Sequence, residues 1–109
     1  MGKISDAAFK GASGEKYGFQ TFTLDSKFEN VGAVYVYTKR TEVDGSGVQK
    51  FLFIGQTRRL EDAMFKHEKW NCLELNGVNC VCIHLDEDEP SRMKKEEDLL
   101  NANKTPCNQ

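Results

Sequence analysis

The sequence predicts a small α+β domain, in which a mixed or antiparallel three-stranded sheet is flanked by helices and preceded by an N-terminal β-hairpin extension. Three observations favour this class. Two runs rich in β-branched and aromatic residues, AVYVYT and KFLFIG, flank the turn sequence VDGSG. A helical spacing of apolar residues follows the second run, and a third strand-like run, NCVCIHL, follows the turn LNGV. The 109 residues are enough for one domain, which we expect to span 1–109.

The individual elements follow in chain order. Residues 1–31 form the N-terminal extension, where apolar residues alternate after a Ser13-Gly14 turn and predict a hairpin. Residues 32–108 form the core. There, Leu60 opens a run with helical spacing, and Pro90 suits the first turn of a second helix. The predicted core elements are strands at 33–38, 51–54 and 79–85 and helices at 60–70 and 91–101.

Composition and charge limit the functional classes. Charged residues make up 29% of the chain and the formal net charge is −2, so the chain lacks the positive excess that attracts nucleic acid non-specifically. No apolar run approaches the roughly 18 residues of a membrane span. The N-terminus also lacks the pattern of a secretory signal. We therefore expect a cytoplasmic protein with no membrane partner.

The four cysteines are Cys72, Cys80, Cys82 and Cys107. Reduced thiols are the default in an intracellular chain, so we expect all four to be free. Cys80, Cys82 and His84 alternate along one face of a predicted strand, where successive side chains are roughly 7 Å apart. Structural zinc sites instead use C-x(2–4)-C pairs. The spacing therefore favours buried thiols over a zinc site.

The strand that ends in Gly55 leads into a helix, and such a junction suits an anionic ligand. Arg59 stands where Asn, Asp, Ser or Thr would normally cap the helix, and a cation there opposes the helix dipole. Because a bound phosphate could reverse that cost, Arg58, Arg59 and Lys66 are the candidate nucleic-acid contacts. The alternative is that these side chains point into water.

The second predicted helix carries a carboxylate on its apolar stripe. At 100° per residue, Met93, Leu99 and Leu100 share one face, and Glu96 falls near the centre of that face. A carboxylate directed inward is costly unless it is paired, hydrogen-bonded or bound to a metal. Glu96 is therefore either satisfied by a lysine or a backbone donor, or it is a metal ligand.

Several short pieces together resemble the GIY-YIG endonuclease domain over residues 32–108, about two-thirds of the chain. Their order matches that family: a strand with a tyrosine, a strand ending in glycine, a helix, a third strand, and a helix with a glutamate before a Pro-x-Asn tail. The matching residues are Ala33-Val34-Tyr35, Phe53-Ile54-Gly55, Thr57, Leu60, His67, Glu96, Leu99-Leu100, Pro106 and Asn108. The resemblance implies metal-dependent hydrolysis of a DNA phosphodiester, with Mg²⁺ as the cofactor of an active enzyme.

The resemblance also implies roles for single residues. Glu96 would be the metal ligand and Tyr35 a general base, whereas Phe53 replaces the second motif tyrosine. The family carries an arginine eight residues after the motif glycine, and counting from Gly55 this position is Ala63. A guanidinium directed at developing charge is worth about 10²–10³ in rate, by analogy with an oxyanion-hole donor. The candidate catalytic positions are Tyr35, Phe53, Gly55, Ala63, His67 and Glu96.

The missing arginine and the acidic composition favour a nuclease-like domain that is catalytically impaired and binds DNA or a protein partner. Phe65 and Trp70 are expected to offer exposed aromatic contacts for such a partner. One alternative is an active Mg²⁺-dependent endonuclease with a rearranged site that uses Arg58 or Arg59. The other is a small inhibitor or decoy, whose acidic run DEDE mimics DNA charge and binds a protein target.

Overall fold

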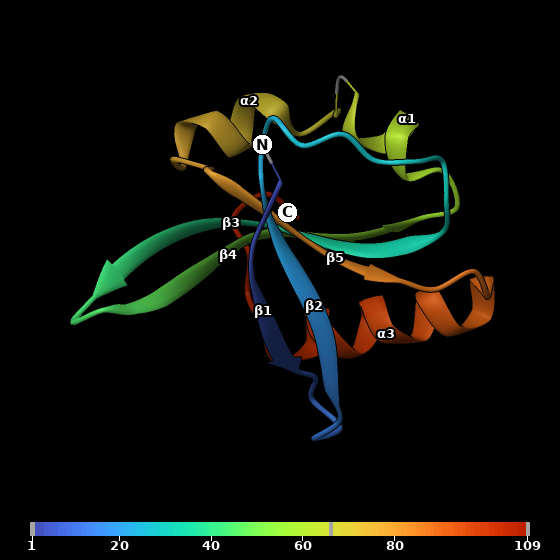
Figure 1. The fold of residues 1–109 in the computed structure, drawn as a ribbon. Coiled ribbons are helices and arrows are strands. Elements are labelled where there is room, and N and C mark those ends of the chain that lie inside the picture. Colours follow the sequence, from blue (N-terminus) through green and yellow to red (C-terminus); the bar gives the residue numbers. More distant parts are fainter. Residues whose placement is uncertain (1, 66, 109) are drawn as a thin grey trace.

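The computed structural model describes residues 2–65 and 67–108 as five strands and three helices. In chain order these are β1 (Lys3–Lys10), β2 (Lys16–Thr23), β3 (Ala33–Val43), β4 (Ser46–Thr57), α1 (Leu60–Met64), α2 (Trp70–Leu75), β5 (Cys80–Leu85) and α3 (Glu89–Ala102). The strands pair into one antiparallel sheet with the order β1-β2-β5-β3-β4 (Figure 1). The predicted α+β class therefore holds.

The prediction of a three-stranded sheet with a separate hairpin extension is wrong, because the N-terminal hairpin belongs to the same sheet. Residues 20–23 of β2 pair antiparallel with residues 80–83 of β5. Without this partner, β5 would present an open edge of unpaired backbone groups. The pairing also buries Phe19 against the core. The result is a curled sheet of five strands rather than three.

The predicted helix at 60–70 is two short helices in the structure. α1 ends at Met64, because the backbone of the next residue, Phe65, is extended (φ −82°, ψ 115°), and a turn precedes α2. The C-terminal helix forms as predicted, but it starts slightly earlier. Asp88 caps α3 by accepting the Ser91 N–H at 3.0 Å, and the proline of the first turn has no N–H to leave unsatisfied.

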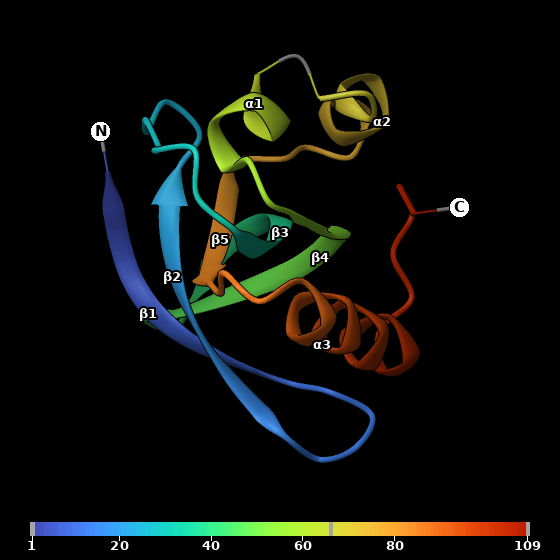
Figure 2. The same cartoon turned by 90° about the vertical axis from the view of Figure 1, so that its right-hand side faces the viewer.

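The helices cover opposite faces of the sheet: α1 and α2 lie over one face and α3 over the other (Figure 2). Side chains of β3 alternate between the two faces, as the period of a strand requires. Because both faces are covered, β3 is buried from Ala33 to Thr38. The core on the α1–α2 face comprises Ala33, Tyr35, Tyr37, Leu52, Leu60, Leu73, Val81, Ile83 and Cys107, and that on the α3 face comprises Phe9, Phe19, Val34, Val36, Ile54, Cys82 and Leu99.

Two asparagine side chains satisfy strand backbone in place of a neighbouring strand. The Asn108 amide accepts from the Ile54 N–H at 2.8 Å and donates to the Ile54 carbonyl at 2.9 Å. Asn79 makes the same pair of bonds with the backbone of Arg40, at 2.7 and 2.9 Å. Asn108 thereby ties the C-terminal tail to the edge strand β4.

The prediction of four free thiols is also wrong, since Cys72 and Cys107 form a disulfide between α2 and the C-terminal tail. The tail returns along β4, where the Cys107 N–H donates to the Leu52 carbonyl at 3.0 Å, and this contact places the two cysteines together. Cys80 and Cys82 are free and buried. The expectation of free thiols followed from the expected cytoplasmic location, so the disulfide does not support that location. Within the described ranges, no helix is long and apolar enough to cross a membrane.

Candidate functional site

Residues from β3, β4 and the α1–α2 segment line one open pocket of about 320 Å³. Its lining comprises Tyr35, Gln56, Thr57, Asp62, Ala63, Phe65, His67 and Glu68. Three of the predicted site residues, Tyr35, Ala63 and His67, therefore lie in the same pocket. The other two motif positions on the sheet, Phe53 and Gly55, adjoin the ring of Tyr35.

Gly55 is a glycine because the ring of Tyr35 crosses the strand at this point. The two residues are directly paired between β3 and β4. A Cβ at position 55 would lie 2.8 Å from the Tyr35 Oη and 2.8 Å from the Phe53 ring. The missing side chain thus leaves room for the two rings, which stack with their centroids 5.9 Å apart.

Tyr35 and His67 are hydrogen-bonded, with 2.9 Å between Oη and Nε2. The second nitrogen of His67, Nδ1, accepts the Lys69 N–H at 3.1 Å, so it carries no proton. Burial lowers the pKa of His67, which favours the neutral ring at pH 7. The remaining proton of a neutral imidazole must then reside on Nε2. His67 therefore donates to Tyr35, and the Tyr35 hydroxyl keeps its own proton for another acceptor.

The surroundings of Tyr35 also disfavour its ionisation. Burial is the main cause that raises the pKa of Tyr35, and the neighbouring Tyr37, Glu96 and Glu68 raise it further. A tyrosinate is consequently scarce at neutral pH, and the group acts as a hydrogen-bond donor. Glu96 is thus close enough to act electrostatically on Tyr35, although it does not line the pocket.

Glu96 is a half-buried carboxylate on α3, and burial raises its pKa. It makes no hydrogen bond or ion pair with any residue in the described part of the chain. The predicted apolar face of this helix is wrong in one respect: Met93 is 53% exposed, and Arg92 occupies the inward position instead. Residues 2–65 and 67–108 contain no group of three or more histidine, cysteine, aspartate or glutamate side chains placed to hold a metal.

The two described candidates for nucleic-acid contact, Arg58 and Arg59, do not line the pocket. Arg59 is exposed, and its Nε bonds to Asp62 Oδ2 at 2.7 Å. Arg58 is exposed and is not part of the pocket lining. Lys66 lies outside the described residues. Ala63 is partly buried against the core, so the side of the pocket that it forms carries no guanidinium.

Sequence reasoning missed two polar residues that the structure connects at this site. Gln56 lines the pocket, and its Oε1 accepts from Arg92 Nε at 3.0 Å. Arg92 is only 2% exposed, and its Nη1 donates to the Asp86 carbonyl at 3.1 Å. One signal was available: Arg92 is one helical turn before Glu96, on the face already predicted to turn inward.

The acidic run DEDE has structural contacts of its own. Asp86 accepts from Lys95 Nζ at 2.8 Å, and this contact is the main reason that the pKa of Asp86 lies well below its usual range. Glu87 accepts the Gly32 N–H at 3.0 Å, and Asp88 caps α3. Three of the four acidic side chains therefore have structural roles within the chain, which explain them without a protein target.

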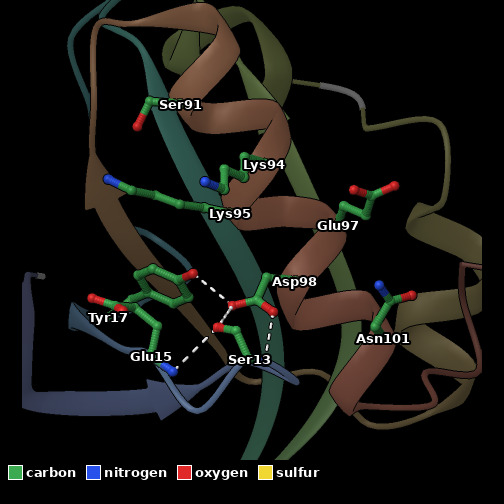
Figure 3. A pocket seen from close by; sticks show the side chains of 9 residues that line it. All are labelled: Ser13, Glu15, Tyr17, Ser91, Lys94, Lys95, Glu97, Asp98 and Asn101. Atoms are coloured by element: carbon green, nitrogen blue, oxygen red, sulfur yellow. Dashed lines mark hydrogen bonds between the residues drawn. The ribbon is translucent and has the colours of Figure 1, made fainter.

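A second, larger pocket of about 560 Å³ lies between the β1–β2 turn and α3 (Figure 3). The side chain of Asp98 accepts from the Tyr17 hydroxyl at 2.6 Å, from the Ser13 hydroxyl at 2.7 Å and from the Ser13 N–H at 2.9 Å. The hydrogen bond to Asp98 is the main cause that raises the pKa of Tyr17 to about 12. These contacts anchor the hairpin to α3, so we assign this cluster a structural role.

An aromatic pocket adjoins the first one, and His67 lines both. Its lining comprises Leu24, Ser26, Phe28, Tyr37, Met64, His67, Trp70 and Val81. The Tyr37 hydroxyl donates to Met64 Sδ at 3.2 Å, and burial raises the pKa of Tyr37 to about 12. This pocket offers apolar and aromatic contacts rather than charge.

Comparison of the chain with protein-family models, with curated proteins and with solved structures finds no match.

Proposed function

We propose that this chain is a GIY-YIG nuclease-like domain that binds nucleic acid at the pocket of Tyr35 and His67 without cleaving it. One observation carries the proposal: His67 donates to Tyr35, because its Nδ1 already accepts the Lys69 N–H. The Tyr35 hydroxyl is then the donor that faces the pocket, which suits a phosphodiester oxygen, and both nitrogens of His67 are occupied, so the pair supplies no base to activate water. The alanine at position 63 removes the guanidinium as well.

A phosphodiester fits the donors that this pocket presents. The Tyr35 hydroxyl has a free proton, and Thr57 Oγ1 accepts the Arg59 N–H at 3.0 Å, so its own hydroxyl proton is also available. Hydrogen bonds to an ionised oxygen are about twice as strong as those between neutral groups. Of the two pocket carboxylates, Asp62 is already paired with Arg59, which reduces its repulsion of an anion.

Glu96 is the one protein ligand that we assign to a bound Mg²⁺ ion. The carboxylate is half-buried and unpaired within the described residues, as a single protein ligand to a hydrated ion can be. A bound ion would polarise a phosphate that shares it. Burial is the main cause that raises the pKa of Tyr35, and the charge of Glu96 adds to it.

Fluorescence anisotropy of a labelled single-stranded oligonucleotide tests the proposal. Tyr35→Phe keeps the ring but removes one donor to a charged oxygen, which is worth about 1.5–3 kcal/mol. We expect the affinity to fall by roughly 10–100-fold. Tyr17→Phe is the matched control, since it loses the same hydroxyl in the hairpin anchor. Absence of binding by the unmodified protein, or equal losses in the two variants, would contradict the proposal.

A second candidate function, a protein-binding module, is favoured by one observation. Trp70, which lines the aromatic pocket, is 36% exposed, and Phe65, which lines a pocket that shares Leu24, Ser26, Phe28 and Met64 with it, is 72% exposed. Large exposed aromatic side chains are typical anchors of protein interfaces. If Trp70→Ala abolished capture of a partner protein while oligonucleotide binding was absent, this function would replace the first.

A further inference from the structure

The aromatic pocket that adjoins the Tyr35 pocket has an uncharged lining. Among the described residues, no aspartate, glutamate, lysine or arginine side chain lines it. A charged group would lose its hydration there without gaining a partner of opposite charge, which is costly. The volume of about 320 Å³ is at the small end of ligand pockets, which span about 300–1,000 Å³. The pocket therefore suits a small, neutral ligand.

The Tyr37 hydroxyl is a buried polar group of this pocket that has only a weak partner. Tyr37 is 3% exposed, and its hydroxyl donates to Met64 Sδ at 3.2 Å. A thioether sulfur is a weak acceptor. Both residues line the pocket, so the oxygen of a bound ligand could accept this proton in place of the sulfur. The pocket thus offers a hydrogen bond to a ligand that carries an acceptor such as a carbonyl.

The aromatic rings that line the pocket contact other rings edge to face. Trp70 and Tyr37 have centroids 6.4 Å apart and planes at 70°, and Phe28 meets Phe22 at 86°. In the described part of the chain, none of the three lining rings stacks face to face with another. Trp70 is also 36% exposed, so a planar ligand can reach it from solvent. Stacking of bases on such rings is typical of proteins that bind single strands.

His67 lies between this pocket and the proposed phosphate site. It lines both pockets, and its ring centroid is 5.3 Å from that of Tyr37 and 5.7 Å from that of Tyr35. Ligand groups in the two pockets would therefore be separated by one side chain, so both could belong to the same strand.

We propose that the aromatic pocket binds a nucleobase, which stacks on Trp70 while one of its carbonyl oxygens accepts a hydrogen bond from the Tyr37 hydroxyl. A base in a bound strand and the base of a free nucleoside share this chemistry. The choice of a strand as the source rests on the proposed function, and the experiment separates the two sources.

The intrinsic fluorescence of Trp70 reports occupation of the pocket, because Trp70 is the only tryptophan of the chain. The probes are oligothymidylate, an abasic phosphodiester strand of the same length, and thymidine. We expect oligothymidylate to quench the fluorescence saturably, since a base stacks on the indole ring. The abasic strand should leave the fluorescence unchanged and bind roughly tenfold or more less tightly, because it lacks the stacking contact. Thymidine should quench only at higher concentrations, since it lacks phosphate contacts.

Two variants locate the base in this pocket through the ratio of the affinities for oligothymidylate and the abasic strand, measured by anisotropy of labelled strands. Trp70→Ala removes the stacking ring, so the ratio should fall to about one. Tyr37→Phe keeps the ring but removes the hydroxyl, so the ratio should fall several-fold. Leu75→Ala is the matched control and should keep the ratio, because Leu75 is on the same helix as Trp70, is 88% exposed and lines neither pocket. An equal fall in the control overturns the assignment to this pocket.

The outcomes for this pocket and for the proposed function are distinguishable. Equal affinity of the unmodified protein for the two strands, with unchanged Trp70 fluorescence, overturns this inference and leaves the proposed function standing. Saturable quenching by thymidine without binding of either strand supports the inference and overturns the proposed function. If no probe quenches Trp70 and no strand binds, both are overturned.

Discussion

Position 55 shows how one missing side chain shapes the pocket. Gly55→Ala places a Cβ within 2.8 Å of the buried Tyr35 ring, which cannot move without disturbing the core. We expect a loss of about 1–3 kcal/mol in the free energy of unfolding, as for other overpacked sites. Gly18→Ala is the matched control in β2, where a Cβ meets nothing within 4 Å. Equal effects in urea denaturation of the two variants would contradict the role of Gly55.

His67 is the residue whose protonation state decides the chemistry of the pocket. Its folded-state pKa lies below the ordinary 6.5, mainly through burial. A depressed pKa contributes stability above pH 6.5, and this contribution is lost as pH falls through the folded value. NMR titration should give a midpoint below 6.5 for His67, with Nε2 protonated in the neutral form. A midpoint above 6.5, or a proton on Nδ1, would remove the reason for assigning Tyr35 as a donor.

At the scale of elements, the local sequence pattern predicted those strands and helices that short-range interactions determine. The strands expected at 33–38, 51–54 and 79–85 lie within β3, β4 and β5 apart from one residue, and the helix expected at 91–101 lies within α3. The pairing of β2 with β5 joins residues about 60 positions apart, and short-range periodicity carries no signal for such a contact.

The candidate site was likewise predicted only in part, and the residues that were missed depend on tertiary contacts. Of the predicted positions, Tyr35, Ala63 and His67 line one pocket, whereas Gln56 and Arg92 were missed. The hydrophobic pattern favoured Met93 as the inward residue of α3. A buried arginine satisfied by an amide and a carbonyl depends on tertiary contacts that composition cannot show.

The disulfide links two elements whose proximity was also unforeseen. Cys72 and Cys107 are 35 residues apart, and closing a loop of this length is expected to contribute about 2–4 kcal/mol to stability. Reduction should therefore lower the free energy of unfolding by that amount, whereas Cys107→Ser should make stability insensitive to reductant. Thiol titration of the denatured, non-reduced protein should find two thiols, Cys80 and Cys82. Four thiols would contradict the link.

At the scale of the whole molecule, the fold brings polar residues from three elements to one pocket. β3 supplies Tyr35, β4 supplies Gln56 and Thr57, and the α1–α2 segment supplies His67. α3 reaches the same region from the opposite face through Arg92, which holds Gln56. The surface carries a net charge of −2, so we expect binding to rely on these few directed contacts rather than on general attraction.

The most direct test of binding without cleavage is a time course on supercoiled plasmid with Mg²⁺ or Mn²⁺. We predict that the unmodified protein leaves the plasmid intact at concentrations that saturate an oligonucleotide. Ala63→Arg, if it folds, restores the guanidinium and is the variant in which nicking could begin. Nicking by the unmodified protein that Glu96→Gln abolishes would contradict the account, because an active metal-dependent nuclease would then use this pocket.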